Sequence, residues 1–161
     1  MAAREQELIE RYEAGPEQVA AAVAGCSAEE LRREDAEGWS VHDVLVHLAD
    51  AEAVRATRVR LILAEERPVL FDFDEGRWRE RLAYRGRSAL LALESYRQAV
   101  RTTADLVVAM PDEAWERDGV HAIDGEVSVR ALIERGIRHA EEHTGQVARL
   151  LARAARAAAR E

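Results

Sequence analysis

Apolar residues recur along this chain with the spacing of amphipathic helices, and the pattern predicts four long helices. In the second of them, Val44, Leu48 and Ile62 fall on one face at about 100° per residue. A proline follows the second and third segments, where a helix is expected to end. The predicted helices extend over about Ala3–Val23, Ser40–Glu66, Ser88–Met110 and Ser128–Ala158.

The start of the second helix carries the clearest local signal. Ser40 is expected to be its N-cap, because Asp43 three residues later completes a capping box. Trp39 and Val44 have the spacing of a hydrophobic staple across the same end. These signals predict a helix that begins at Val41.

Two features modify the first part of the chain. Gly15-Pro16 is expected to kink or interrupt the first helix, because proline has no N–H and clashes with the preceding turn. Ser27 and Glu30 form a second capping box and predict a short helix before the second long one.

The long connection over residues 67–87 determines how the helices are arranged. A connection of this length can cross from one end of a bundle to the other, and it carries a predicted helical turn at Glu75–Leu82. The stretch Val120–Val127, with its Asp124-Gly125 turn signal, is compatible with a small hairpin. Without a convincing strand pattern elsewhere, the chain is predicted to be an all-α four-helix bundle forming one domain over residues 1–161.

Composition and charge exclude several classes of function. The chain has 161 residues and a net charge of −8, which argues against nucleic-acid binding. All 23 basic residues are arginine, so Schiff-base chemistry on lysine is excluded. No apolar run reaches the roughly 18 residues of a membrane span. With one cysteine, Cys26, and a charged N-terminus, the expected location is the cytoplasm.

Three histidines are the candidate chemistry. His139 and His143 are four residues apart in the fourth helix, so they lie on one face. They fall about 80° and 40° from the centre of its apolar stripe, and His47 lies about 100° from that of the second helix. All three can face a seam between helices, where bundles build metal sites. Three ligands would leave one position open for water or substrate, as in catalytic zinc sites.

The histidine pattern also has plainer interpretations. A histidine at the edge of an apolar face is commonly a hydrogen-bonded boundary residue. His42 is expected to face solvent or the helix end, about 140° around the helix from His47. His121 lies in a loop and could line the mouth of a pocket. Imidazole suits zinc, nickel, iron and copper, so the ligands alone do not select the metal.

Several short motifs resemble those of the DinB-like (YfiT-like) metalloenzyme superfamily. The matching segments are Trp39-Ser40-Val41, His47-Leu48-Ala49-Asp50 and the H-x-x-x-H run from His139 to Gln146. The resemblance covers about Leu8–Leu151. It implies an up-down-down-up bundle with one long crossover, and a divalent metal held by His47, His139 and His143. We expect this metal to be zinc or nickel, with iron or manganese as alternatives. It also implies a homodimer.

Two kinds of function remain open. The resemblance suggests a metal-dependent enzyme acting on a small molecule, either a hydrolase or a transferase that joins a low-molecular-weight thiol co-substrate to an electrophile. Arg97 or Arg101 could bind carboxylates of such a thiol, and Gln146, Glu142 and Asp43 are candidates to orient the imidazoles. The alternative is a non-catalytic bundle that the metal stabilises, that binds a small molecule, or that is purely structural and holds no metal.

Overall fold

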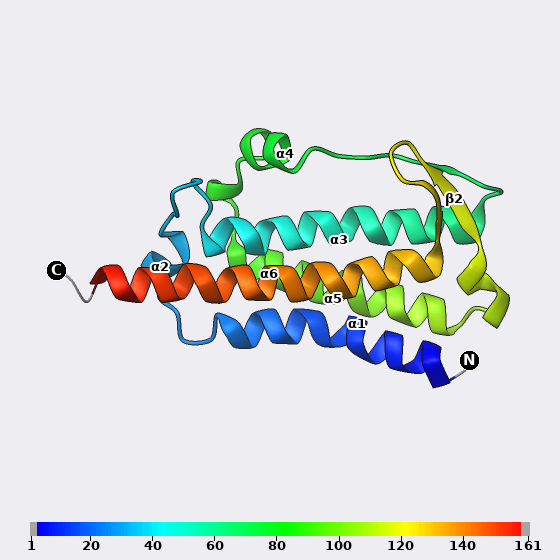
Figure 1. The fold of residues 1–161 in the computed structure, drawn as a ribbon, viewed down its shortest axis with the longest axis horizontal. Helices are drawn as coiled ribbons and strands as arrows, with labels where there is room; N and C mark the ends of the chain where they lie inside the picture. Colours follow the sequence, from blue (N-terminus) through cyan, green and yellow to red (C-terminus); the bar gives the residue numbers. More distant parts are fainter. Residues whose placement is uncertain (1–2, 159–161) are drawn as a thin grey trace.

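The computed structural model describes residues 3–158, and four long helices make up most of it (Figure 1). α1 and α6 run in one direction, and α3 and α5 run in the other. α1 packs against α5 and α6, and α3 packs against the same two helices, so α1 and α3 occupy opposite corners. The predicted four-helix bundle with up-down-down-up order is confirmed. The bounds are α1 (Ala3–Ala22), α3 (Val41–Ala64), α5 (Ala89–Val108) and α6 (Val129–Ala158).

Local capping signals set the helix starts as the sequence predicts. The Ser40 hydroxyl accepts a hydrogen bond from the N–H of Asp43 at 3.1 Å, and the Asp43 carboxylate accepts one from the N–H of Ser40 at 3.2 Å. The same reciprocal pair, Ser27 with Glu30, begins the short helix α2 (Ala28–Arg32). These caps satisfy N–H groups that have no partner within the helix. No helix among residues 3–158 is both long enough and apolar enough to cross a membrane.

The crossover between α3 and α5 makes these two helices parallel. It returns along the outside of α3 (Figure 1) and contains β1 (Val69–Leu70), α4 (Glu75–Arg81) and the 3₁₀ helix η1 (Tyr84–Gly86). The predicted crossover and its helical turn are thus both present. They position a short helix directly against α3.

A small sheet closes one end of the bundle. After the 3₁₀ helix η2 (Asp112–Glu116), β2 (Asp118–His121) and β3 (Gly125–Ser128) form the antiparallel hairpin that the sequence allowed. β1 pairs with β2 in parallel, and this strand was not predicted. The fold is therefore mostly helical and not strictly all-α, since it contains a small three-stranded sheet. β1 could not be predicted because a strand of two residues is too short to show a sequence period.

Two glycines let α1 and α6 approach closely. A Cβ atom on Gly136 would lie 2.7 Å from Cε2 of the buried Tyr12, and one on Gly15 would lie 2.9 Å from Cβ of Ala140. α1 continues through Pro16 without interruption, so the predicted break does not occur. Packing of this segment against α6 outweighs the intrinsic preference of proline to end a helix.

Candidate metal centre

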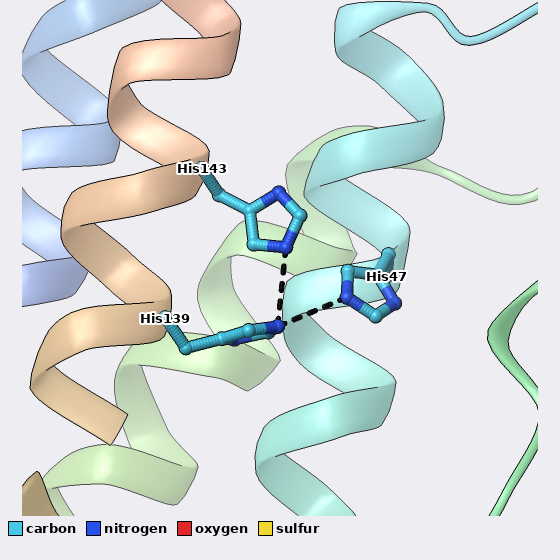
Figure 2. Close-up of side chains that lie close together, drawn as sticks. All are labelled: His47, His139 and His143. Atoms are coloured by element: carbon cyan, nitrogen blue, oxygen red, sulfur yellow. Dashed lines mark hydrogen bonds between the residues drawn. The ribbon is translucent and has the colours of Figure 1, made fainter. Parts of the chain in front are cut away.

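The three predicted histidines converge between α3 and α6. His47 comes from the first half of α3, and His139 and His143 come from adjacent turns of α6, with their rings turned toward one another (Figure 2). Nε2 of His139 lies 3.1 Å from Nε2 of His47 and 3.1 Å from Nε2 of His143. Among residues 3–158 this is the one cluster of potential metal ligands, with all donor atoms within 4.8 Å of one another.

Gln146 sets the orientation and tautomer of one ring. Its Oε1 lies 2.7 Å from Nδ1 of His143. An amide oxygen only accepts hydrogen bonds, so Nδ1 of His143 carries the proton. Nε2 of His143 therefore presents a lone pair to the other two rings, which is the form that a metal ion requires.

The environment keeps these imidazoles neutral. Burial lowers the pKa of His47 to about 4 and that of His139 to about 2, because desolvation penalises the charged ring. The pKa of His143 is also lowered, mainly by burial, although its hydrogen bond to Gln146 acts in the opposite direction. Neutral imidazoles with converging lone pairs are suited to a cation and poorly suited to one another.

The other candidates for orienting the rings have different contacts. Oδ2 of Asp43 accepts a hydrogen bond from the Ser40 hydroxyl and forms an ion pair of 3.1 Å with Arg79. Asp43 therefore does not orient His47, whose buried Nδ1 has no hydrogen bond to any residue in the described range. Glu142 is exposed and affects His143 only through its charge. Of the three predicted supporting residues, Gln146 alone contacts a ring.

The two remaining histidines have structural contacts. His42 was expected to face solvent or the helix end; it is buried and not exposed to solvent, and its Nε2 lies 3.1 Å from the carbonyl oxygen of Tyr84. The crossover folds over the start of α3 and covers it. His121 is buried in the hairpin, where its Nδ1 accepts from the N–H of Asp124 and its Nε2 lies 3.2 Å from Nη2 of Arg58.

A cleft of about 200 Å³ opens beside His139. Three arginines that the sequence pattern did not indicate supply much of its polar lining, together with two carboxylates from the crossover. Arg97 and Arg101, the candidates for binding the carboxylates of a thiol, do not line this cleft, and Arg97 forms an ion pair of 2.5 Å with Glu17. A larger cavity of about 570 Å³ lies under the crossover, but no histidine lines it. The cleft is lined by Ala51, Arg55, Arg58, Asp72, Phe73, Glu75, Leu132, Arg135 and His139.

A buried polar network holds Arg55 at the base of this cleft. The Glu52 carboxylate, fully buried, accepts hydrogen bonds from Arg55 and from the Tyr12 hydroxyl of α1. Burial raises the pKa of Tyr12 well above its usual value, so its hydroxyl stays protonated and donates to Glu52. The network links α1 to α3 and fixes a guanidinium near the histidines.

The fold and this cluster together define a class of protein, a four-helix bundle with a candidate three-histidine metal centre. A family profile described as the DinB superfamily matches residues 11–147, so the chain belongs to the DinB superfamily. The matched segment contains all three histidines.

Individual relatives agree with this assignment. The solved structure of "YfiT from Bacillus subtilis", described as "a probable metal-dependent hydrolase with an unusual four-helix bundle topology", superposes with a TM-score of 0.88, covering 96% of this chain and 90% of that chain. At 21% identity, this likeness shows the fold. Two proteins of Oceanobacillus iheyensis are also similar. "Putative metal-dependent hydrolase OB0413" is 24% identical over 144 residues (88% of this chain, 82% of the relative), and "Putative metal-dependent hydrolase OB0782" is 27% identical over 116 residues (72% and 67%).

Proposed function

We propose that this protein is a metal-dependent hydrolase of small molecules, in which His47, His139 and His143 bind one divalent ion through Nε2. The observation that carries the proposal is the convergence of three imidazoles, with Nε2 of His139 lying 3.1 Å from Nε2 of both His47 and His143. The hydrolase names of similar proteins support the reaction class.

The protein's own groups have defined tasks in such a site. Burial keeps the imidazoles unprotonated, and Gln146 holds His143 with its Nε2 facing inward. Three protein ligands leave at least one coordination position free for substrate or water. A bound divalent ion supplies Lewis-acid chemistry, which polarises a carbonyl or activates water. We propose zinc or nickel as the ion; imidazole ligands also accept iron, and manganese is a further alternative.

The cleft beside His139 favours a substrate with an anionic group. Arg58 and Arg135 line it from α3 and α6, and a guanidinium can bind a carboxylate or phosphate through two parallel hydrogen bonds. The same arginines support a second candidate function, transfer of a carboxylate-bearing low-molecular-weight thiol to an electrophile. The homodimer suggested by the family resemblance remains a prediction.

Metal analysis tests the proposal directly. The protein is purified without a tag, loaded with zinc or nickel and desalted, and metal per chain is measured by plasma mass spectrometry. Wild type is expected to retain about one equivalent and His143→Ala to lose it. His121→Ala, which removes a buried imidazole outside the cluster, should retain the metal.

Loaded wild type is then assayed with panels of esters and amides and, separately, with a thiol and an electrophile. Absence of metal from wild type after loading would overturn the proposal.

A further inference from the structure

A carboxylate from the crossover faces the three-histidine cluster. Glu75 is the first residue of α4, and its Oε1 lies 3.8 Å from Nε2 of His47. It lines the same cleft as His139, and its charge also acts on His143. Glu75 therefore lies close to His47 and beside the cleft that His139 lines, although it is distant from both in sequence.

The crossover is fastened to the bundle on both sides of Glu75. Before it, Arg58 of α3 donates a hydrogen bond of 3.1 Å from Nε to the carbonyl oxygen of Phe71. After it, Arg79 pairs with the buried Asp43 at 3.1 Å. Because these contacts hold the backbone on either side, α4 presents Glu75 to the site from a defined position rather than from a free loop.

The Glu75 carboxylate is available to act as a metal ligand. It is about half exposed, at 54% of its full accessibility, and the contact with His47 is the one ion pair of its carboxylate within residues 3–158. Ligands of a tetrahedral ion at about 2.0–2.1 Å are separated from one another by about 3.4 Å. A shift of a few tenths of an ångström relative to His47 would thus bring Oε1 to the separation of a ligand pair.

We propose that Glu75 is a fourth metal ligand, so that the site is His₃Glu with the carboxylate supplied by the crossover. This inference rests on the proposed three-histidine metal site and extends it. Carboxylate oxygen together with imidazole nitrogen is a normal ligand set for zinc and for other divalent first-row metals. Because Glu75 is half exposed and His47 is fully buried, the carboxylate would be the ligand that gives way to substrate, which would open the coordination position that the proposed function requires.

Metal affinity and cobalt spectroscopy test this role without an enzyme assay. Zinc Kd is measured by competition with a chromophoric chelator for wild type, Glu75→Gln and two controls. Asp72→Asn removes one negative charge from the same cleft, and Glu80→Gln removes one from the same helix. Glu75→Gln is expected to weaken zinc binding at least 10-fold, with both controls within about 3-fold of wild type. The d–d absorption bands of the cobalt(II) form should change in position or intensity in Glu75→Gln alone.

The possible results separate the two proposals. If Glu75→Gln matches wild type in affinity and cobalt spectrum, while His143→Ala loses the metal, the role of Glu75 is overturned and the three-histidine site stands. If Asp72→Asn weakens binding as much as Glu75→Gln and the spectrum is unchanged, cleft charge explains the effect and the ligand role is overturned. If wild type binds neither zinc nor cobalt, both proposals fail.

Discussion

Oε1 of Gln146 accepts a hydrogen bond from Nδ1 of His143 over 2.7 Å, one turn further along α6. This contact fixes which nitrogen of the ring carries the proton, and partners of this kind typically contribute 10- to 100-fold to metal affinity. The relationship is built into a single helix, so it does not depend on how the crossover or the other helices pack.

Removing this hydrogen bond should weaken the metal site without unfolding the protein. We expect Gln146→Ala to raise the zinc Kd by about 10-fold or more, because His143 is then free to rotate and to change tautomer. The exposed Gln98 of α5 offers a matched control, and Gln98→Ala should leave the zinc Kd unchanged. Equal zinc affinity in the two variants would show that Gln146 does not orient the ligand.

Metal removal distinguishes a functional site from a structural one. The apolar core includes Val44, Leu48, Tyr96 and Ile133, and it is built from side chains of all four long helices. We therefore expect chelator-treated protein to keep its helical circular dichroism and to unfold cooperatively. Saturating metal should raise Tm, since binding at 100 times Kd adds about 2.7 kcal/mol. Loss of helicity on chelation would instead favour the non-catalytic, metal-stabilised alternative.

Two glycines of α6 should respond in opposite ways to the same substitution. Gly136→Ala is expected to destabilise the fold by about 1–3 kcal/mol, because the new methyl group would meet the buried Tyr12 ring. At Gly145 the nearest atom is the end of the flexible Arg149 side chain, 3.3 Å away. Gly145→Ala should therefore be neutral or stabilising by up to about 1 kcal/mol, as for a helix interior. Urea denaturation of both variants measures the difference, and similar ΔG values would argue against the close α1–α6 contact.

Local signals explain what could be predicted from the sequence. The Ser40–Asp43 capping box lies within four residues, and the helical period places His139 and His143 on one face whatever the rest of the chain does. The pairing with His47 followed from the apolar stripes, because both helices bury the faces that carry these rings. These parts of the fold and site depend on short-range geometry.

The remaining parts depend on where distant segments pack. The helix position of His42 predicted that it faces solvent or the helix end, and it gave no sign that the returning crossover covers this side chain at Tyr84. Glu75 and Arg55 were not predicted in the site for the same reason, since nothing in their neighbouring sequence shows which helix they will face. β1 has two residues and forms because Pro68 and Val120 meet across the end of the bundle, where the Val120 N–H donates to the Pro68 carbonyl at 2.8 Å.

Acid should destabilise the metal-free protein in a pH range set by the buried histidines. Burial lowers the pKa of His47 from 6.5 to about 4 and that of His139 to about 2. Between pH 6.5 and about 4 the unfolded chain therefore binds more protons than the folded chain, so stability falls as pH falls. The expected loss in the free energy of unfolding is on the order of 1 kcal/mol per histidine for each pH unit below 6.5.

Urea unfolding in the presence of a chelator at pH 7.0, 6.0 and 5.5 measures this loss. The His47→Asn/His139→Asn double variant lacks both groups and should show a flatter dependence. An equally steep dependence in that variant would assign the acid sensitivity to other groups.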